Sequence, residues 1–220
     1  MAVVKPAGQL FQGFTKGSPA PLDIQIKTFI HQKKPTGSPN VYLGIVHRLD
    51  RPVSGVVLFG LNSKFTGRLA EQIQTRQIEK KYLAIVEGRW TEDEGELIDE
   101  LPKKIPGEKH VGDETGNELQ HCELRYKVTQ RSASFTQIAI QLGTGRRNQI
   151  RRQFSLRGHP LVGDLKFGAH AIFPGTADVE PLFRPIALHA LSLKLVHPKN
   201  RTALFLEAPI PGYWNQLLNE

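Results

Sequence analysis

Short apolar segments of strand length dominate this chain and constrain its fold more than any other feature. They are rich in Val and Ile or alternate apolar with polar residues, as β-strands do. The segments are 2–4, 42–46, 55–61, 82–86, 122–128, 135–142, 191–196 and 203–207. They follow one another in runs and do not alternate regularly with helices. The pattern predicts an α+β fold with a mixed, mainly antiparallel sheet.

Helical spacing is confined to a few segments. Ser63 is the expected N-cap of a helix whose apolar residues recur every four positions. Residues 145–158 are predicted to form a second helix that ends at Gly158, and residues 214–218 a short final one. The charged segment 91–118 contains several Pro and Gly and is predicted to be mostly loop. No repeat or linker divides the chain, so residues 1–220 are expected to form one domain.

The overall composition excludes several classes of protein. The chain has 29 Lys and Arg against 21 Asp and Glu, a net charge of +8, which suggests a polyanionic partner such as nucleic acid. The single cysteine, Cys122, excludes a disulfide framework and a Cys-based zinc site. No apolar run reaches the roughly 18–20 residues of a membrane span, and no signal peptide is recognisable. From the single cysteine and the lack of a signal peptide, we expect a cytoplasmic protein. The histidines lack metal-ligand spacing, so no metal is expected.

The densest group of reactive side chains is the segment His47-Arg48-Leu49-Asp50-Arg51. Two arginines beside Asp50 favour the ionised form of its carboxylate. A positioned carboxylate can act as a nucleophile, as a general base or as a stabiliser of a cationic transition state. The structural alternative is a turn-capping aspartate whose arginines point into solvent, and spacing alone favours that alternative because charged turns are common.

Five arginines cluster within twelve residues near the predicted second helix. They are Arg146, Arg147, Arg151, Arg152 and Arg157. On a helix, Arg147 and Arg151 share a face, and like charges at that spacing are unfavourable unless an anion lies between them. The cluster therefore suits contacts with a phosphate backbone, or one arginine turned inward to pair with Asp50. A solvated basic face is an equally good interpretation.

Tyr82 opens an apolar strand after Glu79-Lys80-Lys81. It is either a half-buried strand aromatic or a phenol that stacks on a nucleobase beside a carboxylate. Other chemistries find no support, because residues 143–145 lack the rest of a dinucleotide or P-loop motif and no serine lies in a GxSxG turn.

Together these segments resemble the RluA-type RNA pseudouridine synthases. Five blocks carry the resemblance, in the family's order and over nearly the whole chain: KPAG (5–8), IVHRLDRPVSGVVLFGLNSK (45–64), IEKKYLAIVEG (78–88), LGTGRRNQIRRQFSLRGHPLVGDLKFG (142–168) and IALHALSLKLVHP (186–198). The second block is similar to the family's HRLDxxTSG motif and the fourth to TGRxHQIR…GxPIxGDxxYG.

The resemblance implies an isomerase that converts a uridine of ribosomal or transfer RNA to pseudouridine, in a cleft across a mixed sheet. It implies that Asp50 is the catalytic aspartate, Tyr82 the tyrosine that stacks on uracil and Arg151 the basic partner of Asp50. Arg48 would help to displace the target base.

The charge cluster adds Arg146, Arg147, Arg152 and Arg157 as expected phosphate contacts. No cofactor is expected, and a monomer is the simplest state. The alternatives are a catalytically silent RNA-binding or chaperone-like protein and a basic hydrolase that uses Asp50 as general base.

Three positions depart from the family's pattern. Val53 replaces the Thr of HRLDxxTSG, so Ser54 supplies the remaining hydroxyl in that turn. Asn148 replaces the His of GRxHQIR and Phe167 the Tyr of GDxxYG, and both are expected to affect shape or RNA fit more than the chemical step. The chain also begins inside its first strand, so we expect no N-terminal RNA-binding extension such as an S4 domain.

Overall fold

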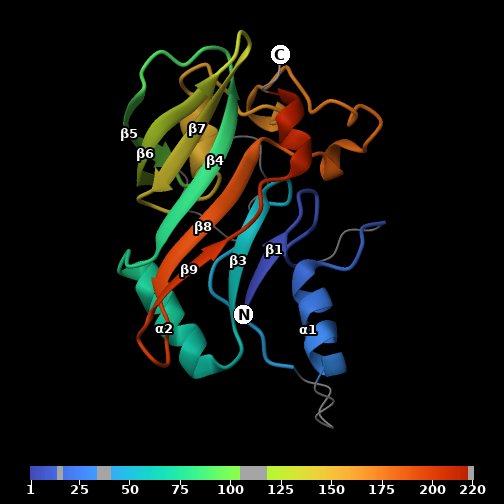
Figure 1. Ribbon diagram of the computed structural model, residues 1–220, viewed down its shortest axis with the longest axis vertical. Coiled ribbons are helices and arrows are strands. Elements are labelled where there is room, and N and C mark those ends of the chain that lie inside the picture. The colour runs from blue at the N-terminus through green and yellow to red at the C-terminus, as the bar shows by residue number, and fades with distance from the viewer. Residues whose placement is uncertain (14–16, 34–40, 105–117, 218–220) are drawn as a thin grey trace.

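A 9-stranded sheet forms the centre of the computed structural model, which describes residues 1–13, 17–33, 41–104 and 118–217 (Figure 1). The strands are β1 (Ala2–Lys5), β2 (Gly44–Ile45), β3 (Ser54–Gly60), β4 (Glu79–Glu87), β5 (Glu94–Pro102), β6 (Leu119–Arg131), β7 (Phe135–Leu142), β8 (Leu188–Val196) and β9 (Ala203–Glu207). The helices are α1 (Leu22–Lys33), α2 (Ser63–Gln74) and α3 (Gln149–Ser155), with 3-10 turns η1 (Leu165–Phe167), η2 (Pro181–Phe183) and η3 (Gly212–Leu217).

The strand order is β1-β3-β8-β4-β7-β6-β5, with β2 added to β3 and β9 to β8. Among the strands of the described residues, the β3–β8 pair is parallel and the other pairs are antiparallel. The prediction of an α+β fold with a mixed, mainly antiparallel sheet is therefore confirmed. Figure 1 shows β4 and β8 crossing the middle of the molecule, with α1 beside β1 at one side.

Burial of apolar strand faces holds the sheet together. The largest cluster joins the sheet to α1 and α3 and includes Val57 of β3, Ile138 of β7 and Phe154 of α3, each essentially inaccessible to solvent. A second cluster packs Leu69 of α2 against β3 and β8. A third buries Trp214 of η3. The amphipathic spacing read from the sequence accounts for these contacts.

The prediction that residues 91–118 are mostly loop was wrong over 94–102, which form β5. Leu97 and Leu101 of this strand are buried, whereas Glu94, Glu96 and Glu100 are exposed. The Glu96 carboxylate pairs with Arg125 of the neighbouring β6, and Glu94 pairs with Lys127. The strand was missed because ion pairs across the sheet cancel a charge that looks typical of a loop in sequence. Residues 105–117 lie outside the described part of the chain.

Several element ends also differ from the predictions. The N-cap of α2 is Asn62, whose Oδ1 accepts a hydrogen bond from the Phe65 amide at 2.9 Å, so Ser63 is already helical. The helix predicted from residue 145 begins only at Gln149 because Asn148 has a left-handed φ of 52°. The last helix is a 3-10 turn over Gly212–Leu217, and residue 218 is not described.

Gly55 marks a close approach between β3 and β8. Its φ is +127°, and a β-carbon there would overlap the backbone N and O of Ala190. We expect Gly55→Ala to lower the free energy of unfolding in urea by about 1–3 kcal/mol, since the added methyl group would strain both the strand contact and the backbone. Gly67→Ala is the control, because Gly67 lies in α2 with open space around it and should gain up to about 1 kcal/mol. Equal effects of the two changes would contradict the expectation.

Candidate active site

The turn that carries Asp50 is held through its backbone carbonyls. The Asp50 carbonyl accepts a hydrogen bond from the Val53 amide at 3.1 Å. The Arg51 carbonyl accepts one from the Gly8 amide at 2.9 Å, and the Pro52 carbonyl one from the Ile186 amide at 3.3 Å. Segments from both ends of the chain thus fix the backbone at this turn.

Lys5 completes these contacts from the end of β1. Its side chain is fully buried, and its ammonium donates to the carbonyls of Arg51 at 2.9 Å, Val53 at 2.8 Å and Pro6 at 2.9 Å. Burial lowers the pKa of Lys5 to about 7, and the nearby charge of Asp50 acts against that shift. The KPAG block was used in the sequence analysis only as a family signature. The structure shows that its lysine braces the Asp50 turn.

Asp50 is paired by Arg151 of α3. The Arg151 Nη1 donates to Oδ2 of Asp50 at 3.2 Å. The Asp50 side chain is 32% exposed, whereas that of Arg151 is 7% exposed. The carboxylate therefore reaches solvent while its partner comes from the interior. Of the alternatives left open by the sequence, the structure shows one arginine of the cluster turned inward to Asp50.

Asp164 is the residue that the sequence analysis missed. Its carboxylate is 1% exposed and binds Arg151 in a bidentate manner, with Oδ2 2.6 Å from Nε and Oδ1 2.7 Å from Nη2. Burial acts to lower the pKa of Arg151, but hydrogen bonds to Asp164 and the charges of Asp164 and Asp50 outweigh it and raise that pKa. The signal was present in the GDLKFG segment, whose aspartate lies among apolar residues.

Two of the three departures from the family's pattern touch Arg151. The Asn148 Oδ1 accepts a hydrogen bond from Nη1 at 3.2 Å, and the Phe167 ring lies 4.7 Å from the guanidinium carbon. Both side chains therefore help to orient the arginine that contacts Asp50.

The third departure, Val53, is 2% exposed and lies in the core. Within the described part of the chain, the Ser54 hydroxyl has no hydrogen bond to the Asp50 turn and lies 2.8 Å from Nδ1 of the buried His189, across the β3–β8 pair. Lys5 and backbone amides hold the turn instead.

Tyr82 lies on β4, is 8% exposed and is close enough to Asp50 for that carboxylate to oppose ionisation of the phenol. Burial, and secondly the charge of Asp50, raise the pKa of the Tyr82 phenol above its usual value. The phenol is therefore neutral at physiological pH. A neutral aromatic ring beside a carboxylate can lie against a planar base without adding charge.

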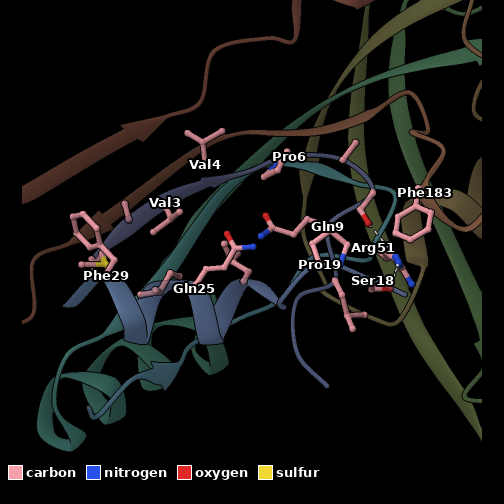
Figure 2. Close-up of a pocket in the computed structure, with 17 residues that line it drawn as sticks. Val3, Val4, Pro6, Gln9, Ser18, Pro19, Gln25, Phe29, Arg51 and Phe183 are labelled. Carbon is pink, nitrogen blue, oxygen red and sulfur yellow. Dashed lines mark hydrogen bonds between the residues drawn. The ribbon is translucent and has the colours of Figure 1, made fainter. Parts of the chain in front are cut away.

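Arg48 and Arg51 flank Asp50 in sequence but do not pair with it. Arg51 turns to the other side of the turn, where it donates to the Gly8 carbonyl at 3.0 Å and the Ser18 hydroxyl at 2.8 Å. Its guanidinium carbon is 4.4 Å from the centre of the Phe183 ring, at one end of a cavity of about 740 Å³ between β1 and α1 (Figure 2). Arg48 is exposed and has no hydrogen bond or ion pair among the described residues.

The other arginines of the cluster have different surroundings. Arg146 and Arg147 are exposed and precede α3, so Arg147 and Arg151 do not share a helix face as expected. Arg152 is half-buried and donates to the Pro102 carbonyl at 2.9 Å. Arg157, which was expected to contact phosphate, pairs with Asp99 at 3.0 Å.

The arrangement provides an accessible carboxylate, a buried cation that fixes it and a neutral phenol beside it. Such a group can perform nucleophilic or general-base chemistry on a substrate that reaches Asp50. Within the described ranges, no three His, Cys, Asp or Glu side chains are grouped so that they could hold a metal ion. The same ranges contain no helix long and apolar enough to cross a membrane.

Removing the charge of Asp164 should destabilise the protein strongly. In Asp164→Asn, the buried Arg151 loses its bidentate partner, and we expect the free energy of unfolding in urea to fall by about 3–5 kcal/mol. Glu96→Gln is the control, because the Glu96–Arg125 pair is exposed and should contribute less than about 1 kcal/mol. Similar losses in the two variants would contradict a structural role for Asp164 in fixing Arg151.

His47 should make the stability depend on pH. Burial, and secondly the charge of Lys80, lower the pKa of His47 to about 4 from an ordinary value of 6.5, and Nε2 accepts a hydrogen bond from the Leu58 amide at 3.1 Å. Between pH 6.5 and 4 the unfolded chain binds a proton that the folded chain does not, so acidification favours unfolding.

We therefore expect His47→Gln to lose less stability than the wild-type protein between pH 7 and 4.5. Urea unfolding at both values measures this difference. Equal losses would show that His47 does not titrate as described.

A family model described as RNA pseudouridylate synthase matches residues 1–156. The chain belongs to this family, and the resemblance to its RluA-type members is confirmed by the relatives that follow.

The chain is 30% identical over 191 residues to the tRNA pseudouridine synthase C of Haemophilus ducreyi, covering 82% of this chain and 78% of the relative. It is 33% identical over 171 residues to the ribosomal large subunit pseudouridine synthase C of Escherichia coli, covering 77% of this chain. It spans 53% of that relative's length. The structure of human RNA pseudouridylate synthase domain containing 4 supports the fold, with a TM-score of 0.77, 21% identity and coverage of 99% of this chain and 88% of the human one.

Proposed function

We propose that this protein isomerises uridine to pseudouridine in ribosomal or transfer RNA, with Asp50 as the catalytic residue. The observation that carries the proposal is the pairing of Asp50 with Arg151 in a chain of the pseudouridine synthase family. Relatives named for ribosomal and for transfer RNA both match, which supports an RNA substrate but does not favour either kind.

The reaction suits the side chains present. The N1–C1′ bond of the nucleotide breaks, the base turns and C5 joins C1′. The C5 hydrogen leaves as a proton and N1 takes up a proton, so the mass is unchanged. Neither a redox change nor a cofactor is required. Asp50 assists this exchange at the sugar or at the base, and Arg151 holds the carboxylate in place through its hydrogen bond.

Recognition requires the uridine to leave its stack, because Asp50 cannot reach a base within a helix. Tyr82 supplies a neutral ring for the displaced uracil. Arg48, exposed two residues before Asp50, assists the displacement. Arg146 and Arg147, exposed before α3, and the half-buried Arg152 contact phosphates.

The remaining proposals concern the whole molecule. Residues 1–220 act as one catalytic domain in the cytoplasm, as a monomer and without a metal. Light scattering during size-exclusion chromatography measures the mass in solution, for which the monomer predicts 24.6 kDa.

Asp50→Asn tests the central proposal. The wild-type protein should release tritium from RNA that carries 5-tritiated uridine, whereas Asp50→Asn should release less than a thousandth as much per unit time, because the amide neither attacks nor accepts a proton. RNA binding by the variant should stay within about threefold, since the carboxylate is replaced by an isosteric group. Mass spectrometry should show an RNA of unchanged mass after the wild-type reaction.

Other outcomes identify the alternatives. A wild-type protein that binds RNA without releasing tritium is an RNA-binding protein, and a shortened product indicates a hydrolase. Wild-type rates in Asp50→Asn would exclude Asp50 as the catalytic residue.

A further inference from the structure

Lys80 is a cation near the site that the proposed mechanism does not use. It lies two residues before Tyr82 on β4, and side chains two apart in a strand point to the same face. Lys81, between them, points to the opposite face, where it is exposed and its ammonium lies 3.2 Å from the Glu79 carboxylate. The two lysines thus carry the same charge at neighbouring positions but in different surroundings.

The ammonium of Lys80 lies close to two segments of the site. A β-carbon added to Gly145 would be 3.1 Å from Nζ of Lys80, so the lack of a side chain at Gly145 makes room for the ammonium. The charge of Lys80 also contributes to the lowered pKa of His47. Lys80 therefore lies beside the start of the segment that contains Asp50 and beside the segment that leads into α3. Both segments present exposed arginines, Arg48 and Arg146.

This cation is half-buried and unneutralised. Among the described residues, no hydrogen bond or ion pair joins Lys80 to another group. Burial, and secondly the charge of Arg76, lower the pKa of Lys80. Arg76 has a carboxylate 4.0 Å away on Glu123, whereas Lys80 has none among these residues. Partly buried charges are normally paired, because removing them from water is costly. A position that keeps such a charge unpaired suits an anion that arrives with a ligand.

We propose that Lys80 binds a backbone phosphate of the substrate RNA, at the target uridine or at a nucleotide next to it. The inference relies on the proposed function, which brings a uridine to Tyr82. Two strand residues span about 6.6–6.8 Å, so a base on Tyr82 places its own or a neighbouring phosphate within reach of Lys80. Phosphate contacts position a nucleic acid without reading its sequence, and an ammonium group can make such a contact as a point charge.

The test compares Lys80→Gln with Lys81→Gln, which remove the same charge from adjacent residues. Binding of poly(uridylic acid) is measured by fluorescence anisotropy from 50 to 300 mM NaCl. Each phosphate contact contributes about 0.7 to the slope of log K against log salt for single strands. We expect Lys80→Gln to lose about that much slope and to bind at least fivefold more weakly at 50 mM NaCl. Lys81→Gln should change binding less than twofold, and Lys80→Arg should retain most of it.

Stability separates this role from a structural one. Lys80→Gln should leave the free energy of unfolding unchanged or raise it, since an unpaired, partly buried charge is removed. A loss of more than about 1 kcal/mol would mean that Lys80 supports the fold. Equal binding by the two glutamine variants, or no binding by the wild-type protein, would also overturn the proposal. These binding and stability measurements need no catalysis. An absence of tritium release would therefore refute the proposed function, whereas RNA binding by Lys80→Gln and Lys81→Gln would still decide whether Lys80 contacts a phosphate.

Discussion

The position of Asp50 depends on one buried guanidinium. Arg151 uses Nε and Nη2 for the two oxygens of Asp164, which fixes the plane of the group and directs Nη1 at Asp50. A hydrogen bond to Asn148 and the Phe167 ring further restrict the orientation of the Arg151 guanidinium. The planar fork of arginine makes this arrangement possible, because its nitrogens lie in one plane at fixed positions, so that two hold one carboxylate side by side while the third is directed at another. The accessible carboxylate is thereby oriented from the interior.

The backbone of the Asp50 turn is held from the opposite direction. Lys5 places an ammonium beneath the carbonyls of Arg51 and Val53, and backbone amides of Gly8 and Ile186 bind neighbouring carbonyls. A turn fixed at both its backbone and its charged side chain loses little freedom when a substrate binds, which is the condition for a positioned catalytic group. The sheet serves this purpose, since β1 and β3 bring Lys5 to Gly55 in register.

The net charge of +8 does not give the number of cations available to RNA around Asp50. Several cations are used inside the protein: Lys5 and Arg151 at the site, Arg51 against Phe183, and Arg157 with Asp99. Conversely, the acidic residues of β5 neutralise basic residues of β6 at the far edge of the sheet. The cations that remain near Asp50 are few, and Arg48 and Lys80 are the two without a partner among the described residues.

Apolar periodicity and short motifs are local properties, so the class of fold, most strands and the candidates Asp50, Tyr82 and Arg151 could be predicted from the amino-acid sequence. It missed β5, whose charges look like those of a loop until β6 lies beside them. Only the tertiary structure assigned the partners. Lys5 meets carbonyls 46 and 48 residues away, and Arg151 meets Asp50 across 101 residues. Which of several arginines reaches one carboxylate depends on how helix, turn and sheet pack together, and no spacing along the chain encodes that choice.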